Sequence, residues 1–396
     1  MIIKRTYKYR IYPTKSQCTC LENQFSMCRH LYNWALEDRI WFYQVHGISL
    51  SLYDQINELP VLKSQRPWFK SVHSHVLQNV LRRLDVSYKN FFRDPGNVGF
   101  PKFKKYKQWQ SITYHQYLSR PDGGKIRASK IGDIKIQYHR VIPESAKIKT
   151  MTIKKEAGKW FVCFSVEQDQ HIELKQTPVN FLGIDLGLID FYYDSDGDHV
   201  SAPRYLRKSE RKLAKLQKKL SKAKKRSKRY KKLLKALQKC HYRIKCQRSD
   251  FLHKTANNLL DKIDFLVFEN LNIKNMTRKP APKKDPNSEK FLPNGASAKS
   301  GLNKSISDAG WFQFLTLLKY KAETLGKQLV GVNPAYTSQT CSGCGKIFKK
   351  ALSVRTHKCP HCGLVLNRDH NAAINILRLG LQSQGFSQEA PAIAFA

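Results

Sequence analysis

Two Cys-x-x-Cys pairs near the end of the chain restrict its fold more than any other feature. They stand in the stretches "CSGCG" and "CPHCG", and the fourteen residues 345–358 separate them. Each pair offers two soft thiolates on a tight turn, and two such turns present four sulfur atoms at tetrahedral distances, as in a closed structural zinc site. The sequence therefore predicts a structural Zn²⁺ ion bound by Cys341, Cys344, Cys359 and Cys362. Because such a site has no open position, we expect it to brace the chain and not to catalyse.

The other cysteines and the apolar runs indicate a reducing environment. The chain has ten Cys, and those outside the two pairs are scattered: Cys18, Cys20, Cys28, Cys163, Cys240 and Cys246. The opening stretch "MIIKRTYKYRIYPTK" is not typical of a secretory signal, so a disulfide framework is not expected. No run reaches the roughly 18–20 apolar residues of a membrane span. We expect a cytoplasmic, nucleoid-associated protein with free thiols and no membrane partner.

The charge of the chain predicts a polyanionic partner. Its 396 residues include 71 Lys and Arg against 30 Asp and Glu, a formal net charge of +41 at pH 7. So large an excess of one sign repels itself unless a polyanion offsets it. The hydrophobic fraction of 41% and the aromatic fraction of 11% are typical of a chain that folds. Nucleic acid is therefore the predicted partner.

Hydrophobic patterns predict a mixed architecture in the first half. Residues 1–14 alternate and are rich in β-branched and aromatic side chains, as in a strand. Helical periods follow from Pro13-Thr14 and again through "SVHSHVLQNVLRRLDVSYKNFFR", and strand patterns return from about 110 to 175. We therefore predict a β-barrel that carries a helical lobe.

A basic segment dominates the middle of the chain. It follows "VNFLGIDLGLIDFYYDSDGDHV", which predicts a buried strand and a hairpin that turns at Asp196 and Gly197. From Arg207 to Arg248 there are about twenty Lys and Arg and one acid, Glu210, around a thin seam of Leu. The pattern predicts a helical hairpin, and like charges at i,i+4 destabilise a helix. We therefore expect a polyanion to lie along it.

The remaining segments alternate between helix, strand and loop. "FLHKTANNLLDKIDFLVFENLN" predicts a helix and a strand, and residues 273–305 predict a mobile loop. "SISDAGWFQFLTLLKYKAETLG" predicts a helix with Ser307 or Asp308 as N-cap and Gly326 as C-cap. "KQLVGVNP" predicts another strand.

Three acids stand at positions that suggest a shared role. Asp185 interrupts the apolar run "FLGIDLG", Glu269 ends "IDFLVFEN", and Asp369 precedes the helical pattern "HNAAINILRL". A carboxylate in a core strand is unfavourable unless it meets a cation or hydrogen-bond donors. Together the three could hold two Mg²⁺ (or Mn²⁺) ions about 3.5–4 Å apart for phosphodiester hydrolysis. Each also has a simpler explanation, Asp369 as an N-cap and Glu269 as a surface residue, but jointly they favour a nuclease centre.

Position separates these three acids from others nearby. Asp190, Asp194, Asp196 and Asp198 lie in the polar hairpin and are interpreted as turn residues. The zinc knuckles lie between the last predicted strand and the helix that begins at Asp369. A zinc clamp at this point would fix Asp369 relative to the other two acids.

Several stretches together resemble TnpB, the family of transposon-encoded RNA-guided nucleases related to type V CRISPR effectors. They are "GIDLG", "FENL", "SDAGWFQFLTLLKYKAE", "NPAYTSQTCSGCG" and "LNRDHNAAINI", with "YRIYPTKSQ", "RHLYNWAL" and "GFPKFK" in the N-terminal half. The likeness covers nearly the whole chain in the expected order. It implies that Asp185, Glu269 and Asp369 are catalytic Mg²⁺ ligands and that Cys341, Cys344, Cys359 and Cys362 bind Zn²⁺.

The resemblance also implies an α+β multidomain fold. The expected parts are a wedge β-barrel over 1–15 and 105–175, a helical recognition lobe over 16–104, a RuvC, RNase H-like α/β nuclease domain over 176–335 with basic helices over 205–250, a zinc-ribbon insert over 336–366, the last nuclease helix over 367–380 and a disordered tail over 381–396.

The activity that the resemblance implies is guided DNA cleavage. A transposon-derived guide RNA pairs with one strand of a double-stranded DNA target, the protein reads a short duplex motif beside the target, and one RuvC-like site cuts by two-metal-ion hydrolysis. A monomer is expected. Gln78 is a candidate for base contact, although a solvated or core-edge glutamine is the simpler interpretation.

Two other functions stay open from the residues alone. An RNase H-like transposase that acts without guide RNA would also use three acids, but it needs a protein unit that recognises DNA ends, usually a helix-turn-helix, and we find no such pattern. A non-cleaving zinc-ribbon protein that binds or regulates RNA would not need carboxylates inside core strands.

Overall fold

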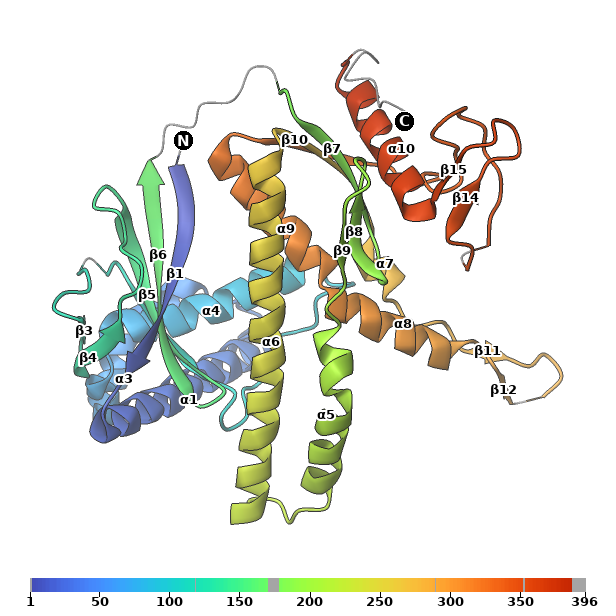
Figure 1. Cartoon of the computed structure of the whole chain (residues 1–396). Helices are drawn as coiled ribbons and strands as arrows, with labels where there is room; N and C mark the ends of the chain where they lie inside the picture. Colours follow the sequence, from blue (N-terminus) through green and yellow to red (C-terminus); the bar gives the residue numbers. More distant parts are fainter. Residues whose placement is uncertain (1, 118, 170–177, 289, 352, 387–396) are drawn as a thin grey trace. The chain divides into compact units, whose positions relative to one another are not determined.

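The computed structural model describes residues 2–117, 119–169, 178–288, 290–351 and 353–386, and the fold is α+β. Its backbone contacts divide the chain into two compact units, Met1–His171 and Ile172–Ala396. Figure 1 shows a sheet with helices in each unit. The predicted domain boundary at 175/176 lies outside the described residues.

A six-stranded antiparallel sheet forms the core of the first unit. Its strands are paired in the order β2-β5-β6-β1-β4-β3. They are β1 (Ile2–Tyr12), β2 (Ser111–His115), β3 (Lys125–Ala128), β4 (Gly132–Gln137), β5 (Lys147–Glu156) and β6 (Lys159–Asp169). The pairing order leaves β2 and β3 as the edges, so within the described residues the strands form an open sheet where a barrel was predicted.

The helices of the first unit pack on this sheet and on one another. They are α1 (Lys15–His46), α2 (Leu52–Asn57), α3 (Leu59–Gln65), the 3₁₀ helix η1 (Pro67–Ser71) and α4 (Ser74–Arg93). Helix α1 begins with a capping box between Thr14 and Gln17 and ends at Gly47 in the left-handed region, as its sequence predicts. Gln78 is half-buried on α4, and its predicted base contact stays a prediction.

The second unit is built on a five-stranded mixed sheet of order β13-β10-β7-β8-β9. The parallel strands are β7 (Phe181–Leu186), β10 (Phe265–Glu269) and β13 (Gln328–Val332), whereas β8 (Asp190–Asp194) and β9 (His199–Ser201) run antiparallel. The predicted turn between β8 and β9 is confirmed, and Gly197 adopts a φ of 94° there. The predicted strand before Pro334 is confirmed as β13.

Helices cover both faces of this sheet (Figure 1). Helix α10 (Arg368–Ser383) packs on the face that carries Gly183 and Val267, because those residues contact it directly. The opposite face, with Ile184 and Phe268, packs against α6 (Lys228–Lys262) and α9 (Trp311–Leu325). A sheet buried on both faces explains why β10 is a continuous apolar run apart from its last residue.

The basic helical hairpin is present, and the segments after it correct three predictions. Helix α5 (Tyr205–Ser221) pairs with α6, which continues through the helix predicted at 251–262. The predicted loop at 273–305 contains α7 (Ile273–Met276), β11 (Lys283–Lys284), β12 (Phe291–Leu292) and most of α8 (Ala296–Ala309). The N-cap prediction is wrong, because Ser307 and Asp308 lie in the last turn of α8 and Gly310 in the left-handed region begins α9. The C-cap at Gly326 is confirmed.

The last helix extends further than the sequence predicts. Helix α10 continues to Ser383, beyond the predicted end at 380, and residues 387–396 of the predicted disordered tail lie outside the described residues. Within the part of the chain that the structure describes, none of the helices combines the length and the apolar character needed to span a bilayer.

Candidate metal centres

Two of the three predicted acids lie at the carboxyl ends of neighbouring parallel strands. Asp185 is the fifth residue of β7, and Glu269 is the last residue of β10. The parallel register pairs Phe268 with Ile184, so the next residues, Glu269 and Asp185, lie side by side. Ligand sites of open α/β sheets form at this edge, beyond the carboxyl ends of the strands.

Helix α10 brings the third acid, Asp369, to the same edge. The N-cap is Asn367, whose side chain accepts a hydrogen bond of 2.8 Å from the Asp369 N–H, so Asp369 is not the cap that the alternative reading required. It stands in the first turn, where the positive end of the helix dipole favours negative charge.

Two glycines set the close approach of α10 to the sheet. A Cβ atom on Gly183 of β7 would lie 2.4 Å from the carbonyl oxygen of Ala373, and one on Gly380 of α10 would lie 2.3 Å from Cγ2 of Val267. Both contacts are impossible for any residue with a side chain unless the backbone moves. The two glycines therefore fix how far Asp369 stands from the strands.

The three carboxylates share one electrostatic environment. Burial raises the pKa of Asp185 well above its ordinary value, and the neighbouring charges of Glu269 and Asp369 raise it further, whereas Arg368 and Arg355 lower it. Burial also raises the pKa of Glu269. A buried carboxylate beside other carboxylates, as Asp185 is, opposes folding when ionised, and a bound cation removes that penalty.

Two hydrogen-bonded partners of these acids were not found by sequence reasoning. The Thr337 hydroxyl donates to Glu269 Oε1 over 2.6 Å, and both residues are buried. Arg355 lies 3.3 Å from Oδ1 of Asp369 and 3.4 Å from Oδ2. Neither residue stands out in the sequence, because each reaches its acid only through tertiary packing. Glu269 is only 8% exposed, so its interpretation as a surface residue is wrong.

The same segment that carries Thr337 is held by the polar side of α10. The Asn375 amide donates to the carbonyl oxygens of Thr337 (3.0 Å) and Thr340 (2.7 Å). Asn371 donates to Thr340 and accepts the Ser342 N–H over 2.9 Å. Buried polar side chains are stable only when they are satisfied in this way. The backbone that leads into the first cysteine knuckle is therefore fastened to the helix of Asp369.

The four predicted zinc ligands form one compact group. Their sulfur atoms all lie within 4.8 Å of one another, with 3.6 Å between Cys341 and Cys362 and between Cys344 and Cys359. Zn–S bonds of about 2.3 Å in a tetrahedron place sulfur atoms about 3.8 Å apart. Burial opposes ionisation of Cys359, but hydrogen bonds from the N–H groups of Cys362 and His361 lower its pKa to about 6, which favours the thiolate that zinc requires. The donor set and its spacing fit Zn²⁺.

The hairpin acids behave differently from the three site acids, with one surprise. Asp194 is buried, and its Oδ1 accepts the Asp198 N–H over 2.8 Å. Burial raises its pKa to about 6. The interpretation as a turn residue agrees with this hydrogen bond, but the side chain is not in a polar, solvated setting as the sequence suggested.

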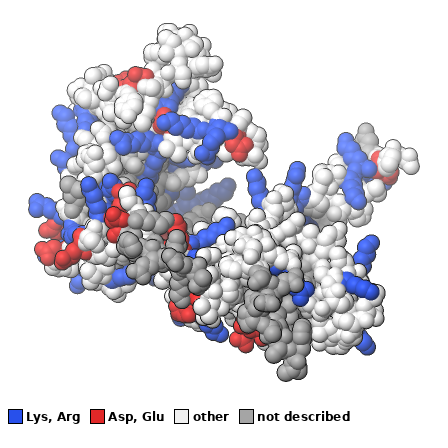
Figure 2. Space-filling view, turned by 90° about the horizontal axis from the view of Figure 1, so that it is seen from above, with Lys and Arg blue, Asp and Glu red and all other residues white. Residues whose placement is uncertain are grey.

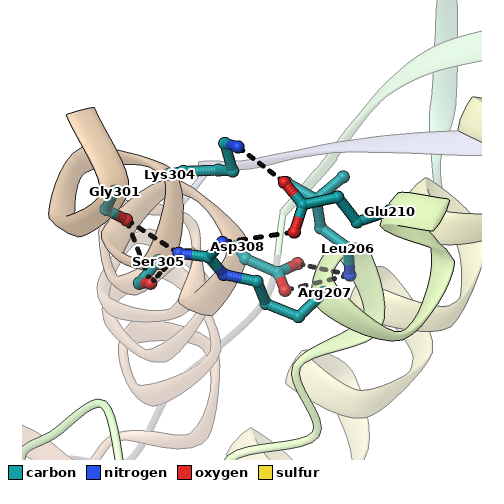
Figure 3. A network of polar contacts seen from close by, with 7 residues as sticks. All are labelled: Leu206, Arg207, Glu210, Gly301, Lys304, Ser305 and Asp308. Carbon is teal, nitrogen blue, oxygen red and sulfur yellow. Dashed lines mark hydrogen bonds and ion pairs between the residues drawn. The ribbon is translucent and has the colours of Figure 1, made fainter. Parts of the chain in front are cut away.

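The basic hairpin is fastened at its root and open along its length. Helix α5 has no side-chain cap of its own, and the Leu206 N–H instead donates to both carboxylate oxygens of Asp308 on α8, at 3.1 and 2.9 Å (Figure 3). Arg248 of α6 donates to the same carboxylate over 2.8 Å. Glu210, the acid within the segment, contacts Arg207 and Lys304. Asp308 therefore joins α5, α6 and α8 at one point.

The outer part of the hairpin presents its cations to solvent. The buried residues of α6 begin at Ile244, and Leu213 is the buried residue of α5. Lys and Arg side chains are also spread over the face seen from above in Figure 2, where Asp and Glu are fewer. A polyanion could therefore contact the hairpin without disturbing the core.

Three family descriptions match separate parts of the chain. "Cas12f1-like, TNB domain" matches residues 311–376, "Probable transposase" matches 161–279, and "Helix-turn-helix domain" matches 1–47. Over residues 2–47 the structure has one strand, β1, and one continuous helix, α1, so the last description does not correspond to a helix-turn-helix here.

The fold is similar to that of a solved nucleic-acid complex. The "Cryo-EM structure of the Cas12f1-sgRNA-target DNA complex" contains a chain that is 12% identical, with a TM-score of 0.54, and the match covers 95% of this chain and 98% of that one. At this identity the match supports an architecture in common and nothing finer.

Two relatives are similar over nearly their whole length. The "Putative RNA-guided DNA endonuclease" of Streptomyces pristinaespiralis is 31% identical, over 96% of this chain and 90% of the relative. The "Putative RNA-guided DNA endonuclease InsQ" of Escherichia coli K12 is 30% identical, over 95% of this chain and 92% of the relative. With the transposase match in its middle and the Cas12f1-like match at its end, the chain belongs to the TnpB/IS605 family.

Proposed function

We propose that this protein is an RNA-guided DNA endonuclease that cuts guide-complementary DNA at one RuvC-like centre. The observation that carries the proposal is the convergence of Asp185, Glu269 and Asp369 at one edge of a mixed sheet, where burial and like charges raise the pKa of Asp185. Both long relatives bear the name of such an enzyme. The five-stranded sheet with α10 on one face serves as the RNase H-like core, and the six-stranded sheet serves as the wedge.

The three carboxylates hold two Mg²⁺ (or Mn²⁺) ions in this proposal. Oxygen donors of this kind suit hard divalent cations, and the mutual repulsion of the acids is what such ions offset. When bound, the ions activate water and stabilise the leaving oxygen. The chain's own part is geometric. Thr337 orients Glu269, the first turn of α10 presents Asp369, and Arg355 places a positive charge beside it.

The four cysteines hold a structural Zn²⁺ ion that supports this geometry. The knuckle segment donates to Glu269 through Thr337, accepts from Asn375 of α10, and reaches Asp369 through Arg355. Because all three links start from the segment between β13 and α10, zinc binding stiffens two of the three acids at once. The zinc centre therefore acts as the frame of the nuclease centre.

The basic hairpin of α5 and α6 contacts the phosphates of the guide RNA or of its duplex with DNA. Its solvent-exposed cations and its fixed root suit a backbone contact that carries no sequence information. Reversing Lys218, Lys222 and Lys225 to Glu should weaken RNA binding and reduce the slope of log affinity against log salt by up to about 3. Reversal of Lys279, Lys283 and Lys284, which are exposed between α7 and α8, is the control for total charge. An unchanged slope in the hairpin variant would refute the contact.

Cleavage with and without RNA tests the proposed function. The protein purified with its RNA should cut plasmid that matches the guide in Mg²⁺, and nuclease-treated protein should not cut. A transposase would need no RNA, and a non-cleaving RNA-binding protein would cut in neither case. Sequencing of the co-purified RNA identifies the guide, and a target without that sequence is the matched control.

A further inference from the structure

A row of aromatic side chains extends from the carboxylate site across the sheet. Tyr193 of β8 lies directly opposite Asp185 of β7 in the antiparallel register, and His199 of β9 lies directly opposite Tyr193. Residues that lie opposite each other in a sheet point to the same face. Asp185, Tyr193 and His199 therefore form one row on the face that α10 covers.

His370 of α10, the residue after Asp369, joins this row and completes a stack of three rings. The Tyr193 ring stacks on His199 at a centroid distance of 5.1 Å and an interplanar angle of 14°. It stacks on His370 at 5.7 Å and 25°. The stack therefore lies beside two of the three acids, because Tyr193 is opposite Asp185 in the sheet and His370 follows Asp369 in the helix.

The hairpin turn between β8 and β9 holds the His370 ring of α10 in place. His370 Nε2 lies 3.1 Å from the carbonyl oxygen of Ser195, and because a carbonyl only accepts, Nε2 carries the proton. A Cβ atom on Gly197 would lie 3.3 Å from the His370 ring, so the turn leaves just enough room for it. The ring is therefore held in one orientation before any substrate arrives.

Core packing does not explain these rings. Tyr193 and His370 are half-buried and His199 is exposed, whereas Phe191 and Tyr192 of the same strand are buried in the core. A preformed stack that ends in an exposed ring, beside a candidate cation site, points to a ligand with flat faces.

We propose that the His370–Tyr193–His199 stack forms a wall of the nuclease centre that holds the sugar and base of the nucleotide next to the scissile phosphate. The inference rests on the proposed function and extends it to substrate positioning. Because Tyr193 already stacks on both histidine rings, the ring face left for a base is that of the exposed His199, which Tyr193 supports from within the stack. Every base has a π-face, so such stacking holds a strand with little regard to its sequence. This suits an enzyme in which base pairing to RNA selects the target. With the base against the row, the backbone of the strand lies toward the carboxylates.

Single-turnover cleavage by the complete protein–RNA complex tests the proposal. His199→Ala and Tyr193→Ala should each slow cutting by about 10- to 100-fold and broaden the set of cut positions, because the first removes the ring that carries the base and the second removes its support. Tyr193→Phe should restore both rate and positions, because it keeps the ring. Gel-shift affinity for guide-complementary DNA should be unchanged in all three. Phe312→Ala removes an exposed ring from α9 and should cut as the wild type does.

A second measurement does not depend on cleavage. In the Asp185→Asn background, 2-aminopurine placed beside the mapped cut site should be quenched by the complex, and His199→Ala should remove that quenching. Wild-type rate, positions and quenching in His199→Ala and Tyr193→Ala would overturn the proposal, provided the wild type cuts with RNA and Asp185→Ala does not. Failure of the wild type to cut with RNA would instead overturn the proposed function.

Discussion

The two candidate metal centres of the second unit are built in opposite ways. The four cysteines come from two tight turns of one short segment, and their sulfur atoms already lie within 4.8 Å of one another. The three carboxylates come from two strands and a helix. Burial and the charges of Glu269 and Asp369 raise the pKa of Asp185. Local turns can assemble a structural site, whereas a catalytic site needs the whole fold to hold like charges together.

The difference also sets an order of dependence between the centres. Thr337, Arg355 and Asn375 connect the knuckle segment to the acids and to α10. Within the part of the chain that the structure describes, the acids make no hydrogen bond to the cysteines, and each knuckle turn closes through its own hydrogen bond, from the Gly345 N–H to the Cys341 carbonyl and from the Gly363 N–H to the Cys359 carbonyl. Damage to the zinc centre should therefore spread to the acids, and damage to the acids should stay local.

The largest expected effect is loss of cleavage in Asp185→Ala, Glu269→Ala and Asp369→Ala. Removal of a metal ligand should reduce the cleavage rate by about a thousandfold or more, because several kcal/mol of transition-state stabilisation is lost. Zinc content and guided DNA binding should not change. Double variants should be no slower than single ones, since the acids act as one unit. Plasmid cleavage in Mg²⁺, gel shifts and metal analysis measure these effects.

The control for these variants is Asp261→Ala, on the exposed side of α6. Asp194→Ala is unsuitable, because Asp194 is buried and holds the Asp198 N–H in the β8–β9 turn. Full cleavage by Asp185→Ala would mean that the active site lies elsewhere.

The next effect in size concerns the cysteines. Cys341→Ser or Cys362→Ser should lose zinc, lower the melting temperature of the second unit and expose residues 336–366 to protease, because structural zinc supplies folding free energy. Cleavage should fall as well, through Thr337 and α10. Metal analysis, limited proteolysis and cleavage assays on one preparation separate these effects. Full cleavage by a zinc-free variant would break the proposed order of dependence.

Much of both centres could be predicted from the sequence, for a reason that differs between them. The cysteine ligands follow from spacing alone, because each pair is local. Asp185 and Glu269 stand out because a charge interrupts an apolar run that only a buried strand explains. Thr337 and Arg355 leave no such signal, since a threonine before a turn and an arginine in a basic chain are ordinary. Their roles exist only once the chain folds back on α10.

The same reasoning explains the errors in the fold. Asp308 has the form of an N-cap in sequence, but it caps α5 from a distance instead of its own helix. The polar, Gly-containing residues 296–305 suggested a loop, yet contacts of α8 with α5 stabilise them as a helix. In each case tertiary partners outweighed local propensity.

A smaller effect is expected from the spacing of α10. Gly380→Ala should destabilise the second unit by about 1–3 kcal/mol, the range for overpacking, because the β-branched side chain of Val267 has little freedom to move away. It should also slow cleavage by moving Asp369, without loss of zinc. Gly301→Ala on α8 is the matched control: nothing lies within 4 Å of its added Cβ, so it should be neutral or stabilise by up to about 1 kcal/mol. Denaturant unfolding of both variants measures the difference, and equal stability would contradict the close packing.

The smallest effect is a gain in stability when the charge of Asp185 is removed from protein that holds zinc but no Mg²⁺. Burial and the neighbouring carboxylates of Glu269 and Asp369 raise the pKa of Asp185 in the folded state. The folded state therefore binds this proton more tightly than the unfolded state, so the group favours folding at low pH. That contribution is lost as the pH rises from the ordinary carboxyl range through the raised pKa. At pH 7.5 the ionised group opposes folding until a cation offsets it.

Asp185→Asn should consequently raise the melting temperature of the zinc-loaded, Mg²⁺-free protein by a few degrees at pH 7.5, and by less at pH 5. Mg²⁺ should raise the melting temperature of the wild type but not that of the variant, because the variant lacks a ligand. Calorimetry at both pH values with and without Mg²⁺ measures the four differences, with Asp261→Asn as the control for a lost surface charge. A lower melting temperature for Asp185→Asn at pH 7.5 would mean that the carboxylate is compensated within the fold itself, for example by Arg368 and Arg355. The contrast between a preassembled zinc centre and a repulsive carboxylate centre would then fail.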